Sequence, residues 1–245
     1  MILVEHEEGV ARVTLDRAEK KNALTPAMLR ELTAVAAGLD FKTRAVLLTG
    51  AGDAFCAGFD LTLCKDDPGA MAALLKGLSQ AMRALRRAGA PVVVCAHGAA
   101  IAGGCALLGG ADVVVTDRGA KLGYPVVRLG VSPAVTSAML AQAIGPGATR
   151  HRLLDPKLFS GADALRSGLA HYCEDDAAGA LARADEIARA LAAKPPHAVR
   201  VTKRWLSELD GSLDDRVLNA ALEASLALAG GDEERGRLAA LWTKG

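Results

Sequence analysis

Aromatic side chains are scarce in this 245-residue sequence, where Phe, Trp and Tyr together make up 3% of the positions. A groove that stacks sugar rings or nucleobases needs several such rings, so the composition argues against both kinds of ligand. Neither sign of charge dominates, because 29 Lys and Arg stand against 28 Asp and Glu and leave a formal net charge of +1. Without a basic block, neither nucleic acid nor a membrane surface is favoured as a partner.

Long apolar runs, clustered histidines and framework cysteines are missing as well. No apolar run reaches the roughly 20 residues of a membrane-spanning helix, and the first ten residues, MILVEHEEGV, lack the basic start of a signal peptide. The five histidines are scattered without the spacing of metal ligands, so we expect no metal site. Five cysteines, an odd number, indicate reduced thiols and predict a cytoplasmic location.

Hydrophobic residues make up 51% of the sequence, enough for a chain of this length to bury a substantial core. Two short aliphatic runs, Ala45–Thr49 and Val92–Ala96, are bounded by Gly or Pro and indicate strands that are buried on both faces. Helical patterns alternate with such strands, for example over Ala70–Ala88. This alternation predicts an α/β fold with a mostly parallel sheet and crossover helices.

Two helix boundaries can be read from capping residues and helix breakers. Thr25 before Pro26 predicts the start of a helix that runs to about Leu39. A second helix is expected over Ala134–Ile144, ended by Gly145-Pro146. From Pro195 onward only helical patterns follow, which predicts a helical appendage rather than a second core.

Glycines follow both buried strands: Gly50, Gly52 and Gly58 after the first, Gly98, Gly103 and Gly104 after the second. Glycine lets backbone N–H groups face a ligand at close range, because no Cβ stands in the way. Two such loops side by side could direct two backbone donors at one oxygen atom, the geometry of an oxyanion hole. The alternative is that these glycines serve only tight strand-to-helix turns.

Four motifs give the chain a family resemblance: KKNALT, LLTGAGDAFCAGFDL, AHGAAIAGGCALLGGAD and GYPVVRLGVSP. In this order and at these separations they resemble the crotonase (enoyl-CoA hydratase/isomerase) superfamily, and the similarity runs through nearly the whole chain. The resemblance implies a core of repeated ββα units wound into a spiral, over residues 1–195. It also implies a C-terminal helical region, over residues 196–245, that takes part in trimerisation.

The resemblance places two oxyanion-hole amides on Phe59 and Gly103, where they would hold the carbonyl oxygen of an acyl-CoA thioester. Coenzyme A would enter as part of the substrate, with no separate cofactor. The residues expected to contact it are Lys21, Ala23, Leu24, Ala57, Asp60 and Leu61, and both Lys20 and Lys21 could meet its phosphates unless they form a solvated turn. A homotrimer or a dimer of trimers is the assembly that the family implies.

Ala106 and Val126 stand where a hydratase of this family carries its two glutamates. Those glutamates handle water and an α-proton, and neither alanine nor valine can move a proton. Other chemistries of the superfamily place an Asp or a Tyr further along the third motif, where this chain reads Ser132-Pro133-Ala134. The sequence therefore predicts the scaffold of the family without its usual bases.

Several polar side chains could replace the missing glutamates. Those in or directly after the GYPVVRLGVSP motif are Tyr124, Arg128, Ser132, Thr136 and Ser137. Asp60 is better explained as the cap of the next helix, and Asp117 is expected to be exposed after its strand. His97 is expected to be hydrogen-bonded in a turn. Cys105 lies near a helix start, a setting that lowers the pKa of a thiol, and paired with His97 it would resemble a nucleophilic site. Packing of a small residue is the alternative for Cys105.

Three functional hypotheses remain open from the sequence. The first is an isomerase, decarboxylase or similar enzyme that runs on oxyanion stabilisation. The second is a catalytically inactive protein that binds an acyl-CoA or a partner subunit, and the third is a hydrolase that uses Cys105. Apolar residues of the tail favour an oligomer; they are Leu206, Leu209, Leu213, Val217, Leu218, Leu222, Leu226 and Leu228.

Overall fold

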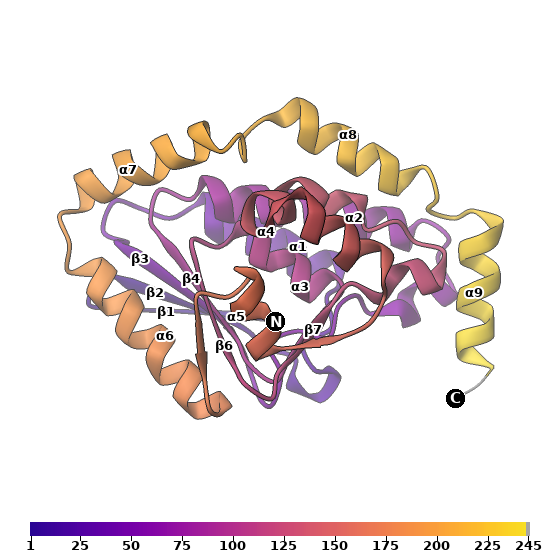
Figure 1. The fold of residues 1–245 in the computed structure, drawn as a ribbon, viewed down its shortest axis with the longest axis horizontal. Helices are drawn as coiled ribbons and strands as arrows, with labels where there is room; N and C mark the ends of the chain where they lie inside the picture. The colour runs from indigo at the N-terminus through magenta and orange to yellow at the C-terminus, as the bar shows by residue number, and fades with distance from the viewer. Residues whose placement is uncertain (244–245) are drawn as a thin grey trace.

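A six-stranded sheet forms the centre of the protein, for which the computed structural model describes residues 1–243 (Figure 1). Its strands, in spatial order, are β1 (Ile2–Glu7), β2 (Val10–Leu15), β3 (Ala45–Gly50), β4 (Val92–Ala96), β6 (Val113–Asp117) and β9 (Tyr172–Glu174). β1 pairs antiparallel with β2, and the other neighbours pair parallel. The predicted α/β fold with a mostly parallel sheet is confirmed.

A second, smaller sheet joins three short strands, β5 (Ala99–Ile101), β7 (Lys121–Gly123) and β8 (Phe159–Ser160). Short helical segments connect the strands of both sheets: α3 (Gly103–Leu107), α5 (Gly161–Ser167) and the 3₁₀ turns η1 (Ala18–Lys20), η2 (Leu61–Lys65), η3 (Leu108–Gly110) and η4 (Pro125–Leu129). The sequence did not predict β5, because three residues are too few for a visible period of two.

Two kinds of helix cover the two faces of the large sheet. α1 (Pro26–Ala37) and α2 (Ala70–Arg87) pack their Leu and Met side chains on one face, within the main core. α6 (Ala177–Ala192) covers the other face with a stripe of alanines at every fourth position, 180, 184, 188 and 192, all buried. Residues four apart lie on one side of a helix, so this stripe brings the backbone of α6 close to the sheet.

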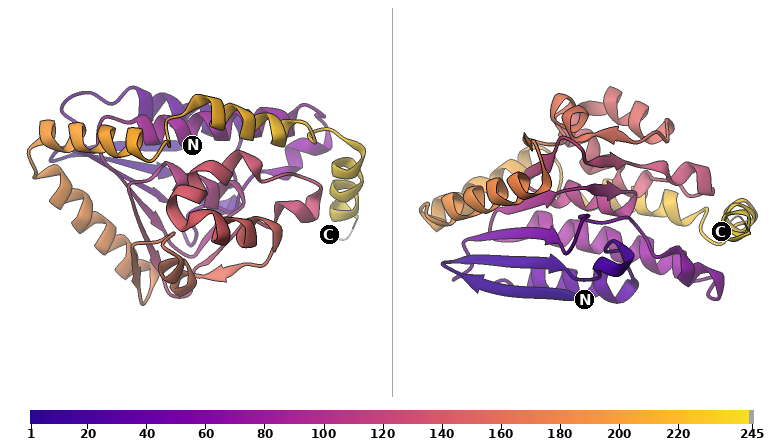
Figure 2. Two further views of the ribbon diagram at one scale, coloured as in Figure 1. Left: turned by 45° about the horizontal axis from the view of Figure 1, so that its top comes forward. Right: turned by 90° about the horizontal axis from the view of Figure 1, so that it is seen from below.

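Three helices, α7 (Pro196–Leu209), α8 (Asp215–Leu226) and α9 (Asp232–Trp242), run along the outside of the molecule (Figures 1 and 2). α8 contacts α2 and α4 (Ala134–Leu154), and Lys203 of α7 is buried with its ammonium 2.8 Å from Asp112 Oδ2. These helices fall in the predicted region 196–245, while the division of the chain at residue 195 stays a prediction. Within residues 1–243 no helix combines the length and apolarity that crossing a membrane requires.

The two helix boundaries predicted from capping residues and helix breakers agree with the structure. Thr25 caps α1 as expected, because its Oγ1 accepts a hydrogen bond of 3.2 Å from Met28 N. The end predicted at Gly145-Pro146 is confirmed, because within α4 (Ala134–Leu154) Gly145 has the non-helical angles φ +78° and ψ 160° and separates two helical stretches. The second stretch, which begins at Pro146, was not predicted. Proline is compatible with a first helical turn, so it can start this second stretch directly after the break.

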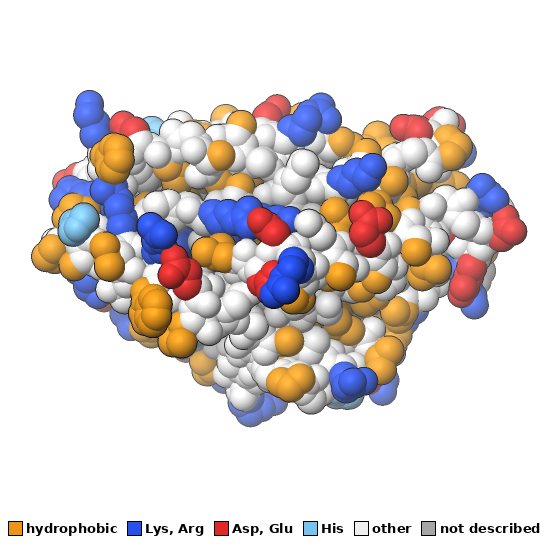
Figure 3. Space-filling view, turned by 90° about the horizontal axis from the view of Figure 1, so that it is seen from above, with side chains coloured by type: hydrophobic (Ala, Val, Ile, Leu, Met, Phe, Trp, Pro, Cys, Tyr) orange, Lys and Arg blue, Asp and Glu red, His pale blue; other side chains and the backbone are white. Residues whose placement is uncertain are grey.

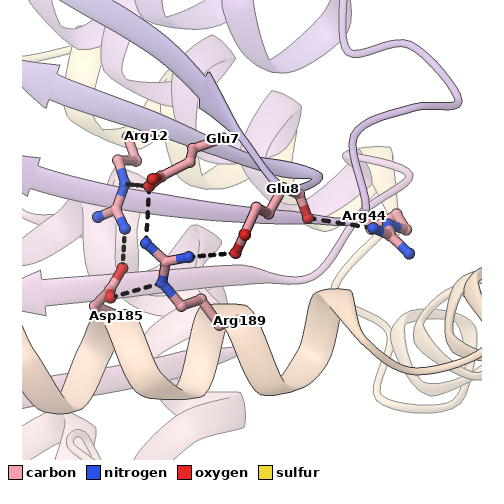
Figure 4. A network of polar contacts seen from close by, with 6 residues as sticks. All are labelled: Glu7, Glu8, Arg12, Arg44, Asp185 and Arg189. Atoms are coloured by element: carbon pink, nitrogen blue, oxygen red, sulfur yellow. Dashed lines mark hydrogen bonds and ion pairs between the residues drawn. The ribbon is translucent and has the colours of Figure 1, made fainter.

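An ion-pair network ties α6 to the N-terminal hairpin (Figure 4). Arg12 of β2 pairs with Asp185 of α6, and Arg189 Nε lies 3.0 Å from Asp185 Oδ2. Arg189 also reaches Glu7 at 2.8 Å and Glu8 at 2.6 Å, at the end of β1 and in the turn after it. Asp185 thus accepts from two guanidinium groups that come from different elements.

We expect Asp185→Asn to unfold more easily than the wild type at pH 7 and to lose less stability on acidification. Burial alone raises the pKa of Asp185, but hydrogen bonds from Arg189 and Arg12 outweigh it and hold the pKa below its usual value. The ionised carboxylate therefore stabilises the fold above the ordinary Asp pKa of about 3.9, and this contribution is lost as the pH falls through the folded-state pKa. Urea unfolding at pH 7 and pH 3 measures both differences. Equal acid sensitivity of the two proteins would contradict this role of Asp185.

Candidate active site

A cavity of about 220 Å³ lies between the loop after β3, helices α2 and α3, η4 and the start of α4. It is lined by Ala57, Phe59, Leu61, Met71, Leu75, Leu78, Ile101, Ala102, Gly103, Ala106, Tyr124, Pro125, Val126, Leu129, Val131, Ser132, Pro133, Val135 and Thr136. These residues include no Asp, Glu, His, Lys or Arg. The cavity is therefore apolar and suits an acyl chain better than a charged group.

Backbone pairing holds the loop after β3 against both the KKNALT segment and β5. Cys56 N donates to Ala99 O at 2.9 Å, which anchors this loop on β5. Leu24 N donates to Gly58 O at 2.7 Å, and Asp60 N donates to Leu24 O at 2.9 Å. In such a ladder alternate amides point away from the partner segment, so the amide between Gly58 and Asp60, that of Phe59, is left unpaired.

Phe59 and Gly103 each offer a backbone amide at the cavity wall. Gly103 is the first residue of α3, where a helix amide has no partner within the helix. Neither the Phe59 nor the Gly103 amide donates a hydrogen bond to a protein group within residues 1–243. The two loops approach closely: a Cβ on Gly58, which has φ +100°, would lie 3.7 Å from Gly103 N and 2.9 Å from Ile101 O. Two unpaired donors on adjacent loops could thus serve a single ligand oxygen.

Backbone strain is stored directly before α3. Ala102 has φ +52° and ψ −114°, a conformation that a residue with a Cβ rarely adopts. Such residues cost on the order of 1–3 kcal/mol each and persist only where the surrounding structure holds them. Ala102 lines the cavity, and its strained turn sets the position of the Gly103 amide.

The two positions predicted for glutamates lie in the same cavity as these amides. Ala106 of α3 is buried and Val126 of η4 is half-buried, and both line the cavity wall. A carboxylate at either position would reach the cavity interior. As the sequence stands, neither side chain can accept a proton.

The acids weighed as substitutes are engaged elsewhere. Asp60 caps η2 as expected, accepting from Thr62 N at 3.2 Å and pairing with Arg17 Nη1 at 2.7 Å. Burial alone raises the pKa of Asp60, but hydrogen bonds from Thr62 and Arg17 outweigh it and keep the pKa below its usual value. The expectation that Asp117 is exposed is wrong: it is 6% exposed, and its carboxylate accepts from Gly98 N at 2.7 Å, which holds the loop after β4. Neither acid lines the cavity.

Of the two readings of Cys105, the structure favours packing of a small residue over a nucleophile with a lowered pKa. Cys105 is fully buried, and this burial raises the pKa of its thiol to about 11, because a thiolate would have to lose its hydration. His97 Nδ1 lies 3.9 Å from Cys95 Sγ, and His97 Nε2 lies 3.0 Å from Gly52 O, as expected for a residue that holds a turn. Cys105 is not part of the cavity wall, so the hydrolase hypothesis lacks its nucleophile.

The segments expected to contact coenzyme A differ in their access to the cavity. Ala57 and Leu61 line it, whereas Leu24 is fully buried in the core. Lys21 is exposed and Ala23 is half-buried, and neither forms part of the cavity wall. Ala57 N donates to Lys21 O at 2.9 Å, so the segment around Lys21 lies beside the segment around Ala57, two residues before Phe59.

Asn22 is a structural residue near the site that no prediction from the sequence included. Asn22 is fully buried with φ +56°, and its Nδ2 donates to Ala51 O at 2.9 Å and to Ala54 O at 2.8 Å. Its Oδ1 accepts from Arg17 N at 2.9 Å. Asparagine tolerates this left-handed conformation better than most residues, so the N of KKNALT was the available signal.

Comparisons with known proteins agree with the fold and the motifs. The family model for enoyl-CoA hydratase/isomerase matches residues 5–229. A protein of Thermus thermophilus, provisionally named an enoyl-CoA hydratase, is 35% identical over 96% of this chain and 95% of its own length. The short-chain-enoyl-CoA hydratase of Clostridium acetobutylicum is 29% identical over 84% of this chain and 80% of its own. The crystal structure of an enoyl-CoA hydratase/isomerase from Xanthobacter autotrophicus superimposes with a TM-score of 0.86 at 31% identity, covering 96% of this chain and 90% of that one.

Proposed function

Because the chain belongs to the enoyl-CoA hydratase/isomerase family, we propose that it is an enzyme that forms an enolate from an acyl-CoA thioester. The amides of Phe59 and Gly103 would hold the thioester oxygen and stabilise the negative charge that develops on it. The observation that carries this proposal is that both amides are unpaired at the wall of one apolar cavity. Donors fixed in this way typically contribute about 10²–10³-fold in rate each.

The reaction class follows from the residues that line the cavity. Hydration needs a positioned carboxylate to activate water, and Ala106 and Val126 occupy the two places for it. Decarboxylation of a malonyl-type thioester needs no protein base: the bond to the carboxylate breaks, CO₂ leaves, and the electron pair passes into the enolate. An apolar cavity also disfavours the charged carboxylate relative to neutral CO₂. Decarboxylation is therefore our first choice, and double-bond isomerisation comes second, because it requires a base to remove the α-proton and the described cavity wall includes no Asp, Glu, His, Lys or Arg.

The lack of an Asp, Glu, His, Lys or Arg side chain in the described wall of the cavity also supports a second candidate, a protein that binds an acyl-CoA without turning it over. Calorimetry with acetyl-CoA and butyryl-CoA tests the binding that both candidates share. Incubation with malonyl-CoA, a 3-enoyl-CoA and crotonyl-CoA then separates them by product analysis. Binding with decarboxylation or isomerisation supports the enzyme, and binding without any turnover supports the second candidate. If neither thioester binds at millimolar concentration, both fail.

We expect the protein to assemble as a trimer or a dimer of trimers. Apolar side chains stay exposed on the outer helices, with Trp205 at 60%, Leu206 at 53%, Leu209 at 69% and Val217 at 52%. Figure 3 shows apolar side chains exposed among charged ones on the face that α7 and α8 cross. Exposed apolar surface of this kind is stabilised when a second copy covers it. Light scattering should give a multiple of three times 25.2 kDa, and a monomeric mass would sink this expectation.

A further inference from the structure

Arg17 is not among the residues that line the cavity, yet its guanidinium joins the two segments that set the direction of the Phe59 amide. Arg17 Nη1 donates to Ala23 O at 3.0 Å and lies 2.7 Å from Asp60 Oδ2. Ala23 belongs to the KKNALT segment, and Asp60 follows Phe59 directly. A single nitrogen atom therefore ties the KKNALT segment to the loop that carries the amide.

The backbone pairing between these two segments is short around Phe59. Leu24 N donates to Gly58 O at 2.7 Å and Leu24 O accepts from Asp60 N at 2.9 Å, which forms an isolated bridge rather than a pair of strands. The Phe59 amide points away from Leu24 only as long as this bridge keeps its alignment. A charge-assisted contact next to the bridge restrains it more strongly than another neutral hydrogen bond would.

The Asp60 carboxylate is held from two directions. Its Oδ2 faces Arg17, while its Oδ1 accepts from Thr62 N at 3.2 Å and from Thr62 Oγ1 at 2.5 Å. The side chains of Asp60 and Arg17 are 7% and 19% exposed, so solvent screens this ion pair less than it screens a pair on the surface. The carboxylate, and with it the backbone just after Phe59, therefore has little freedom to shift.

We propose that Arg17 is a positioning residue, which holds Asp60 against the KKNALT segment and thereby directs the Phe59 amide at the thioester oxygen. This inference rests on the proposed function, in which the amides of Phe59 and Gly103 hold that oxygen. Arg17 acts only through the backbone, because its side chain does not reach the cavity wall. A displacement of about 1 Å in a reacting group can cost on the order of 10²-fold in rate, so a small shift of the amide matters.

Calorimetry with butyryl-CoA and with butyl-CoA, a thioether that lacks the carbonyl oxygen, measures this contact without any turnover. The wild type should bind the thioester about fivefold or more tightly, because two amides would donate to its oxygen. Arg17→Met removes the charge and keeps a long side chain. It should reduce the preference to less than about twofold while the affinity for butyl-CoA is kept. In the enolate-forming reaction kcat should fall about 10- to 100-fold with little change in KM.

Two further variants keep the test independent of the folding of Arg17→Met. Arg17→Lys retains the charge on a side chain one bond shorter, so it should give a preference between those of the wild type and Arg17→Met. Asp60→Asn weakens the pair from its other side and should lower the preference as well.

Lys203→Met is the matched control, because Lys203 Nζ also donates to a carbonyl, Ala90 O at 2.9 Å, and lies 2.8 Å from a carboxylate, that of Asp112. Lys203→Met and Arg17→Met both break a largely buried ion pair and should melt below the wild type, but Lys203→Met should keep the full preference for the thioester. Full preference in folded Arg17→Met and Asp60→Asn proteins, or an equal loss in Lys203→Met, would overturn the positioning role and leave the proposed function standing. Absence of the preference in the wild type would overturn both.

Discussion

Hydration of crotonyl-CoA by the wild-type protein should be slower by orders of magnitude than hydration by a relative with two glutamates. General acid–base assistance from a positioned carboxylate typically contributes about 10²–10⁴-fold for each group. Ala106 and Val126 both line the cavity, and the described cavity wall includes no Asp or Glu. Both contributions are therefore missing. Loss of the absorbance of the enoyl thioester measures the rate directly. Turnover comparable with that of an ordinary hydratase would mean that another residue acts as the base. Asp60 and Tyr124 would be the first candidates.

The double substitution Ala106→Glu with Val126→Glu should raise this hydratase activity if the thioester carbonyl is held as proposed. Both carboxylates would enter an apolar cavity, and their burial would raise their pKa values toward the range of a general acid. The matched control is Ala106→Gln with Val126→Gln, which fills the same volume without a group that moves protons. Equal activity of the glutamate and glutamine pairs would show that the carbonyl is not positioned for hydration.

Gly103→Ala keeps the backbone amide but should displace it, and it should lower the rate of the enolate-forming reaction by as much as about 10²–10³-fold, the loss expected when one oxyanion-hole donor no longer reaches the oxygen. A Cβ on Gly103 would lie 2.8 Å from Cε1 and 3.0 Å from Cδ1 of the Phe59 ring, closer than atoms can pack. Either the ring, which is half-buried, or the backbone of Gly103 has to shift, and a backbone shift on either loop changes the spacing of the two amides. The decrease should appear in kcat more than in KM, because the contact strengthens as charge develops on the oxygen.

Gly236→Ala is the control for the same added methyl group at a remote site. Gly236 lies in α9, where a Cβ would meet nothing within 4 Å. Alanine there should raise the free energy of unfolding by about 1 kcal/mol through helix propensity and leave catalysis unchanged. Full activity of a folded Gly103→Ala protein would refute the assignment of the Gly103 amide.

The parts of the fold that the sequence predicts well are those with a strong local signal. β3 and β4 come from short aliphatic runs, and α1 begins where Thr25 can cap it before Pro26. The glycine loops are brought together as expected, because the parallel pairing of β3 with β4 places the segments that follow them at one end of the sheet. The comparisons confirm the family that the motifs indicate.

The parts that the sequence could not predict depend on burial by distant segments. Cys105 follows a helix start, which lowers the pKa of a thiol, but complete burial has the larger and opposite effect. Asp117 is the last residue of β6, yet it is buried, and its carboxylate accepts a hydrogen bond from the Gly98 amide of a distant loop. The carbonyl of Ser132 at the start of α4 accepts a hydrogen bond from Ser225 of α8, more than ninety positions later. In each case the local sequence pattern around the residue does not indicate its burial or its hydrogen-bond partner.

The two faces of the large sheet differ in how well they tolerate substitutions, because α6 packs on one face through its alanine stripe. On that face the sheet meets only methyl groups at the four buried positions of the stripe, so one extra methylene there pushes the whole helix outward. On the opposite face Met71, Leu75 and Leu78 of α2 reach the cavity with large, flexible side chains that can be shortened or exchanged one at a time. Substitutions in α2 can therefore change the size of acyl group that the cavity accepts. The packing of α6 on the far face of the sheet stays unchanged, and so does the position of the two amides.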